Sequence, residues 1–171
     1  MSAAPFTHSQ MYHFRIATNE DIACVNWLDT FSSSPHRELS KEVEKYFGSV
    51  DPSVHERNII FVAELNEAVE TQLPFRAIAK AELLLAPSVV VSDVGYIKRV
   101  VVHPEWRGMR VAQSLLEYIE SEAHTYQVRH LDLHVWDQNT SAIQLYERIG
   151  FHVRHRELYM RKTLPELEDN K

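Results

Sequence analysis

The sequence predicts an α/β or α+β fold with a mixed sheet, because strand-like and helix-like segments alternate along one continuous chain. The expected order is strand, two helices, three strands, helix, strand, helix and two closing strands, an order that builds a sheet covered by helices. The 171 residues include 44% apolar and 25% charged side chains, as is usual for one globular domain. We therefore expect a single domain over residues 1–171, with residues 1–11 and 165–171 fraying at the ends.

In the first half of the chain, the sequence predicts six elements, four strands and two helices. Apolar and β-branched runs bounded by polar residues indicate strands, whereas Thr18, Asn19 and Asp21 offer a cap and N-terminal acids to a helix. A more polar segment that ends near Gly48 predicts a second helix, since glycine is favoured after a helix. The expected elements are a strand over 12–17, helices over 21–31 and 34–48, and strands over 59–65, 75–85 and 94–103, the first two of which form an antiparallel hairpin.

The second half predicts two helices and three strands. Apolar residues at helical spacing indicate a helix over 110–126, and strict alternation of apolar and polar residues indicates a strand over 130–136. A further helix follows Asn139 and stops at Gly150, and residues 151–164 are expected to form the two closing strands.

Composition narrows the possible functions. No apolar run approaches the about 18 residues that span a bilayer, and the N-terminal segment lacks the charged-then-apolar order of a secretory signal. The single cysteine, Cys24, is expected to be a small apolar helix residue and not a nucleophile. The net charge of -6 disfavours a nucleic-acid module and suits a cationic partner better. We therefore expect a cytoplasmic protein with no nucleic-acid or membrane partner.

The segment from Val100 to Leu116 passes from a β-branched strand into a helix, with Arg107, Gly108 and Arg110 at the junction. The first four N–H groups of a helix lack intrahelical partners, so such a corner attracts anions, and a phosphate-bearing ligand is the natural guest. The lysine of a P-loop and the three glycines of a dinucleotide fingerprint are both absent. A purely structural turn remains the alternative at this point.

Two motifs together point to a family. "VVVHPEWRGMRVA" and "VWDQNTSAIQLYERIGF" occur in this order and resemble the loop and the following helix of the GNAT superfamily of acyl-CoA-dependent N-acetyltransferases. The specific match runs from residue 94 to 151, and the flanking element order agrees more loosely. The resemblance implies a mostly antiparallel central sheet of about seven strands, flanked by about four helices and splayed between the fourth and fifth strands.

The resemblance also implies residue roles. Asn139 would hydrogen-bond the pantetheine arm of acetyl-CoA, and Tyr146 would protonate the departing thiolate. The backbone of the strand before the loop would pair with pantetheine like an added strand. The loop amides, with the Arg107 side chain, would hold the diphosphate. These cofactor-binding residues are Val100, Val101, Val102, Arg107, Gly108, Met109, Arg110, Val111, Ala112 and Asn139.

The sequence departs from the family pattern at two positions. Arg110 stands where the second glycine of the loop is usual, so it either turns away from the diphosphate or lends charge to a phosphate. Tyr96 stands where many relatives have a glutamate that acts as the general base, and we place Tyr96 in the acceptor site. His134 is our candidate for the missing base, because an imidazole titrates near neutral pH. His103, or Asp93 and Glu82 acting through water, are alternatives; His103 is more easily explained as a cap before Pro104.

The resulting expectation is direct acetyl transfer from acetyl-CoA to a primary amine of a small cationic metabolite. A protein or peptide amine is the alternative acceptor, and a non-catalytic acyl-CoA sensor is the alternative function. Trp136 is placed in the acceptor pocket, which is expected between the first two helices and the loops at 66–74 and 87–93. The histidines lack an acid or cysteine pattern that would complete a metal site, so no metal is expected. A homodimer is compatible with the sequence.

Overall fold

The computed structural model of the chain describes residues 11–32, 57–85, 93–156, 158, 160 and 162. The chain forms two compact units, Met1–Trp136 and Asp137–Lys171, and each is described by itself. The fold is a mixed α/β arrangement, and in its described part it contains a five-stranded sheet and three α-helices. Among these residues, no helix has both the length and the apolar character that crossing a membrane would require.

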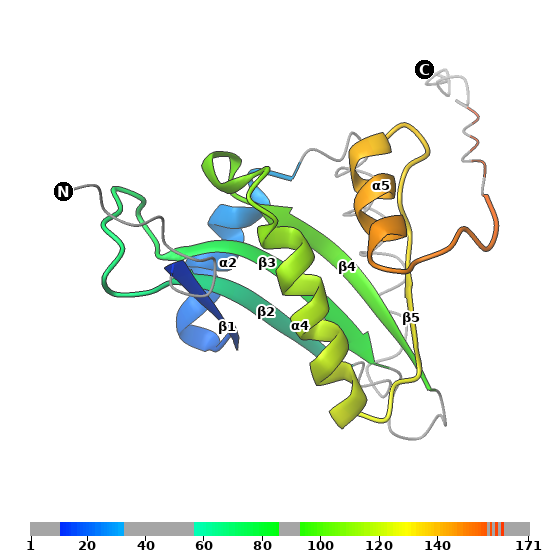
Figure 1. Cartoon of the computed structure of the whole chain (residues 1–171), viewed down its shortest axis with the longest axis horizontal. Helices are drawn as coiled ribbons and strands as arrows, with labels where there is room; N and C mark the ends of the chain where they lie inside the picture. The colour runs from blue at the N-terminus through cyan, green and yellow to red at the C-terminus, as the bar shows by residue number, and fades with distance from the viewer. Residues whose placement is uncertain are drawn as a thin grey trace, which may run out of the picture. The chain divides into compact units, whose positions relative to one another are not determined.

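The sheet belongs to the first unit, and its strands lie in sequence order (Figure 1). The first three pairings are antiparallel, and the last one is parallel. The predicted mixed sheet and the predicted hairpin are therefore confirmed. The strands are β1 Tyr12–Ile16, β2 Arg57–Leu65, β3 Ala77–Leu85, β4 Val94–Val102 and β5 His130–Leu133.

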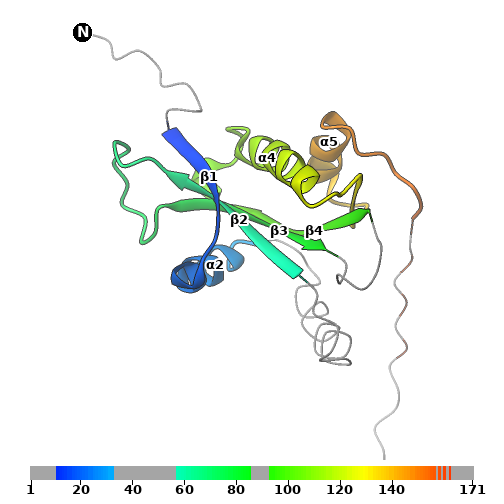
Figure 2. The ribbon, with the colours of Figure 1, turned by 90° about the horizontal axis from the view of Figure 1, so that it is seen from below.

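In the described part of the first unit, the helices α2 Ile22–Asp29 and α4 Val111–Thr125 lie on opposite faces of the sheet (Figure 2). Successive side chains of a strand point to opposite faces, and β2 shows the consequence. Phe61 contacts Tyr118 of α4 at a ring-centroid distance of 6.0 Å, whereas its neighbour Val62 packs with residues of α2. The buried core therefore has a layer on each side of the sheet.

The residues that the sequence predicted to cap the first helix lie directly before α2. Thr18 caps the single 3₁₀ turn η1 Asn19–Asp21, and the Asp21 carboxylate accepts a hydrogen bond from the Thr18 N–H at 2.8 Å. The Arg15 guanidinium of β1 donates two hydrogen bonds to the same carboxylate, at 2.7 and 2.8 Å. These bonds lower the pKa of Asp21 to about 2. Burial raises the pKa of the Cys24 thiol to about 11, so this cysteine is an apolar helix residue.

Most differences from the predicted elements occur at their ends. The expected strand over 75–85 begins at Ala77 because the Arg76 guanidinium donates to the carbonyls of Leu65 and Val69 and ties down the preceding loop. The expected strand over 130–136 ends at Leu133, where its pairing with Ile97 of β4 also ends. Residues 134–136 are exposed.

The seven strands and four helices are not confirmed. The expected second helix over 34–48 lies outside the described residues. The described residues between 151 and 162 lie in no strand, so the two closing strands have no support from this part of the chain. In the second unit, α5 Thr140–Arg148 is confirmed, and Gly150 follows it at φ +98°, a value that favours glycine.

Candidate functional site

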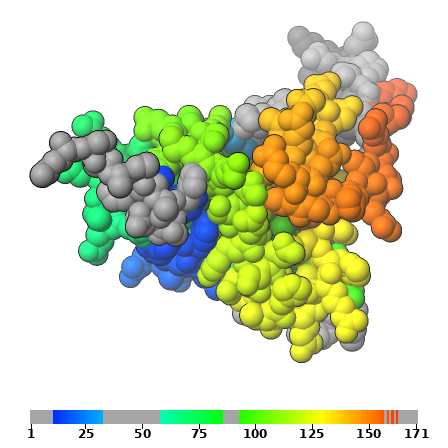
Figure 3. All heavy atoms as spheres, in the orientation of Figure 1, coloured from blue at the N-terminus to red at the C-terminus, as the bar shows by residue number. Residues whose placement is uncertain are grey.

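A short loop joins β4 to α4 and forms an exposed corner. Its first part is the 3₁₀ turn η2 Pro104–Trp106, which is capped by His103, as the sequence predicts: the Glu105 N–H donates to His103 Nδ1 at 3.4 Å. Gly108 follows at φ +76°, and a Cβ built on it would meet no atom within 4 Å. Residues 107–110 are all exposed, and the loop lies at the surface in the space-filling view (Figure 3).

The corner presents backbone hydrogen-bond donors for which no described residue supplies an acceptor. In the described part of the chain, the N–H groups of residues 108–113 have no acceptor, and the helix start has no side-chain cap. The first bond of the helix runs from the Ser114 N–H to the Arg110 carbonyl at 3.0 Å. These donors lie at the positive end of a 15-residue helix. Such an arrangement binds anions, phosphate groups in particular.

Two side chains fix the base of this corner. Arg107 Nε donates to the Val102 carbonyl at 3.1 Å, and its Nη2 donates to the Phe31 carbonyl at 2.9 Å. The buried His103 ring stacks on Trp27 at 5.1 Å between centroids and meets Phe31 edge-on at 4.7 Å. The corner is thus anchored to the end of α2, and Arg107 has a structural role besides its predicted contact with a phosphate.

Among the described residues, β4 has no strand partner on its β5 side beyond Ile97, and we call this part its open edge. The parallel pairing of β4 with β5 covers only Val94–Ile97, whereas β3 pairs with β4 as far as Val102. Between these two regions the register of β4 shifts, and Arg99 adopts a left-handed conformation at φ 52°. Val100, Val101 and Val102 therefore follow a β-bulge, at the place where the resemblance predicts that the two strands diverge.

Tyr96 and His134 meet where the β4–β5 pairing ends. The Tyr96 hydroxyl lies 2.7 Å from His134 Nδ1, and the two ring centroids are 5.6 Å apart. Tyr96 is opposite Asp132 in the parallel register, so both rings lie on the face of the sheet that α2 covers. The structure thus joins two residues that the sequence assigned to separate roles.

Asn139 and Tyr146 belong to the second unit, where they occupy one helix. Asn139 is the N-cap of α5: its Oδ1 accepts hydrogen bonds from the Ala142 N–H at 3.3 Å and from the Ser141 hydroxyl at 3.2 Å. Tyr146 lies half-buried two turns later, and its ring meets Phe151 edge-on at 5.8 Å. Capping therefore accounts for the Asn139 oxygen, while its amide nitrogen remains suited to another contact.

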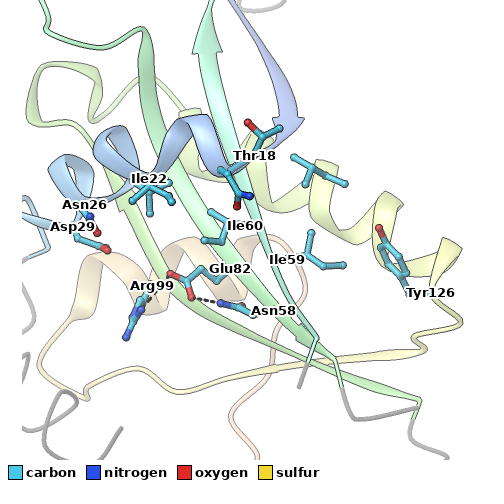
Figure 4. A pocket seen from close by; sticks show the side chains of 14 residues that line it. Thr18, Ile22, Asn26, Asp29, Asn58, Ile59, Ile60, Glu82, Arg99 and Tyr126 are labelled. Atoms are coloured by element: carbon cyan, nitrogen blue, oxygen red, sulfur yellow. Dashed lines mark hydrogen bonds and ion pairs between the residues drawn. The ribbon is translucent and has the colours of Figure 1, made fainter. Parts of the chain in front are cut away.

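A cavity of about 540 Å³ lies beneath α2 (Figure 4). Its walls combine aliphatic side chains, such as Ile22 and Ile60, with polar ones, such as Asn26 and Asn58. The first helix borders this cavity, whereas the loop at 66–74, which was also expected to border the acceptor pocket, contributes no lining residue. The other lining residues are Ile16, Ala17, Thr18, Asn19, Val25, Asp29, Ile59, Glu82, Arg99 and Tyr126.

A buried charge cluster forms part of the cavity floor. Lys80 is fully buried, and its Nζ lies 2.8 Å from Asp29 Oδ1 and 2.9 Å from Glu82 Oε1. Burial alone would raise the pKa of Glu82, but Lys80, Asn58 and Arg99 together outweigh it, so the pKa lies below its ordinary value. Glu82 is therefore an ionised carboxylate and is poorly suited to collect a proton at neutral pH.

The features that sequence reasoning missed include the charge cluster, the bulge at Arg99 and the ring stack around His103. The alternation of Lys80 and Glu82 in an apolar strand was the available signal, because two charges on one face of a buried strand need partners. Trp136 and Tyr96 were both predicted in the acceptor pocket, and neither is among the residues that line the cavity. Trp136 is 40% exposed after the end of β5.

A model of the acetyltransferase (GNAT) family matches residues 20–151. No curated protein matches the chain significantly. The chain is similar to the aminoglycoside acetyltransferase AAC(6')-Iy in complex with a CoA-containing bisubstrate analogue: identity is 15%, the TM-score is 0.59, and 90% of this chain and 99% of that one are covered. It is also similar to an acetyltransferase of Trypanosoma brucei, with 17% identity and a TM-score of 0.59, over 88% of this chain and 99% of that one. The third similar structure is the ribosomal-protein-S18-alanine N-acetyltransferase of Escherichia coli, with 24% identity and a TM-score of 0.56, over 83% of this chain and 78% of that one.

Proposed function

The chain belongs to the acetyltransferase (GNAT) family, and on that premise we propose that it moves an acetyl group from acetyl-CoA directly to a primary amine of a small cationic metabolite. The observation that carries this proposal is the exposed corner, whose N–H groups at residues 108–113 have no acceptor among the described residues. A diphosphate is the group that such a donor set fits best.

Acetyl-CoA supplies the activated acetyl group, and the chain supplies its binding site. The N–H groups from Gly108 to Ala112 bind the diphosphate, and the open space above Gly108 allows the phosphates to approach the backbone. The backbone of Val100–Val102, which follows the bulge beside the open part of β4, pairs with the pantetheine amides. For Asn139 of the second unit, we propose that its side-chain amide nitrogen donates a hydrogen bond to pantetheine.

Two proton transfers remain for the side chains. An alkylammonium has a pKa of about 10.4, so the amine must lose a proton before it attacks the acetyl carbon. His134, which is oriented by its 2.7 Å contact with Tyr96, accepts this proton. The Tyr146 hydroxyl then donates a proton to the departing sulfur.

The cavity beneath α2 is our candidate for the acceptor pocket. Its Asp29 carboxylate and its three asparagine side chains offer acceptors to an ammonium group, and the net charge of -6 favours the approach of a cation. Among the similar structures are enzymes for an aminoglycoside and for a ribosomal protein. A peptide amine is therefore the second acceptor class to test.

The test is thiol release from acetyl-CoA in the presence of a panel of amines that contains polyamines, aminoglycosides and peptides with a free N-terminus. We expect saturable release with at least one small cationic amine and little release without an amine. Release with peptides alone would change the acceptor class. Binding of acetyl-CoA in calorimetry without any amine-dependent release would instead identify a sensor, a function consistent with Tyr96 and Arg110 replacing the usual residues.

Replacing Arg110 by glycine is expected to leave acetyl-CoA affinity equal or better. Arg110 occupies the N-cap position of α4 without a capping hydrogen bond, and its φ is 59°. This left-handed conformation costs a non-glycine residue about 1 kcal/mol. Calorimetry measures the affinity, and Gln127→Gly is the matched control because Gln127 has φ 62° at the opposite end of α4. A loss of affinity of more than about tenfold for Arg110→Gly alone would show that the arginine binds the cofactor.

A further inference from the structure

We propose that Glu82, buried in β3, is a positioning residue that holds the left-handed bulge at Arg99 and thereby sets the course of the cofactor-binding backbone at Val100–Val102. This inference rests on the proposed function for its consequence in acetyl-CoA binding. Its structural part, a carboxylate that stabilises a bulge in the neighbouring strand, rests on contacts within the first unit.

The bulge is visible in the pairing of β3 with β4. Lys80 is opposite Val101, and Glu82 is opposite Lys98, so one residue of β3 faces both Arg99 and Val100. The extra residue is accommodated because Arg99 adopts φ 52°. An arginine adopts this conformation at a cost, whereas a glycine adopts it freely. The surrounding structure must therefore stabilise it.

Glu82 provides that stabilisation from the opposite strand. Its side chain is only 1% exposed and is fixed by Lys80 Nζ at 2.9 Å from Oε1 and by Asn58 Nδ2 at 3.0 Å from Oε2. The two cationic residues at the bulge approach the same carboxylate. Lys98 Nζ lies at 3.9 Å, and Arg99 Nη1 lies at 3.6 Å, with Arg99 beside Glu82 in Figure 4. A fixed negative charge thus attracts the Arg99 side chain, whose backbone forms the bulge.

The position of the bulge decides which backbone groups reach the open edge. A shift of register by one residue turns every following side chain of a strand to the other face. Beyond the bulge, the His103 N–H donates to the Ile78 carbonyl at 2.8 Å, which fixes the end of β4. Between these two anchors lie Val100, Val101 and Val102. Loss of the charge at Glu82 would therefore affect the backbone that we assign to pantetheine.

The experiment compares Glu82→Gln, Arg99→Gly and the double variant in the full-length chain. Calorimetry with acetyl-CoA, without any amine, measures affinity, and amide resonances of Val100–Val102 report the bulge without a ligand. We expect Glu82→Gln to weaken binding about tenfold and to shift these resonances. Arg99→Gly should bind nearly as the native chain does. In the double variant the affinity should return to within about threefold of native, since glycine needs no anchor.

Glu64→Gln is the matched control, because Glu64 is also an ion-paired carboxylate in a strand but contacts Arg15 instead of the bulge. It should leave both readouts unchanged. Unaltered resonances and affinity in Glu82→Gln, or a double variant no better than Glu82→Gln, would overturn the inference. A native chain that binds no acetyl-CoA would refute the proposed function, while the resonances would still decide whether Glu82 holds the bulge.

Discussion

Replacing Lys80 by methionine is expected to lower the free energy of unfolding by about 3–5 kcal/mol. The lysine side chain is fully buried and lies within 2.9 Å of two carboxylates, Asp29 and Glu82. Methionine fills a similar volume, so the main change is the loss of the positive charge between them. Glu82 would then keep a buried charge without its nearest counter-ion. Urea unfolding at neutral pH, followed by tryptophan fluorescence, measures the change.

Lys98→Met is the matched control for this prediction. Lys98 approaches the same carboxylate, but at 3.9 Å and with 27% of its side chain exposed. Its removal is therefore expected to cost less than about 1 kcal/mol, as is typical of solvent-exposed ion pairs. If the two variants were equally stable, the cluster around Lys80 would not be a major source of stability, and the argument from burial would be wrong.

Replacing Tyr146 by phenylalanine is expected to lower the turnover of acetyl transfer about 100-fold. The substitution removes one hydroxyl and keeps the ring that meets Phe151 edge-on. A tyrosine hydroxyl with a pKa of about 10 can protonate a thiolate whose conjugate thiol has a pKa of about 8.5. Steady-state thiol release with the best amine of the panel measures kcat, and KM for acetyl-CoA should change little.

Tyr118→Phe is the control, because this half-buried tyrosine packs on Phe14 and Phe61 in the first unit. It should retain native turnover. His134→Gln separates the two proton transfers: it should slow the reaction of amines that are protonated at neutral pH and lose much of its effect at high pH. Native turnover in Tyr146→Phe would exclude the hydroxyl as the acid and leave water to protonate the sulfur.

Local patterns in the sequence predicted much of this fold. The helical spacing of Val111, Leu115, Ile119 and Ala123 predicted α4 to within one residue at each end. The turn chemistry of Thr18 and Gly150 likewise placed a helix start and a helix end. These features depend on residues that are neighbours along the chain, so their physical cause is contained in a short segment.

The candidate site was predictable where a motif carried it. The Arg-Gly step after a β-branched run predicted a corner that could bind an anion, and the structure shows that this corner is exposed. The pairing of Tyr96 with His134 was not predictable, because 38 residues separate them and the parallel register of β4 and β5 brings them together. The internal contacts of Arg107 were missed for the same reason: Phe31 is 76 residues away.

The amino-acid sequence by itself determined the order of the elements described here, the family and the place of the exposed corner, since each depends on local periodicity, capping or a contiguous motif. The tertiary structure alone decided where the charges of Lys80 and Glu82 find partners and where β4 bulges. Both depend on the register between strands, which is set by packing against the two helical layers and cannot be deduced from either strand alone.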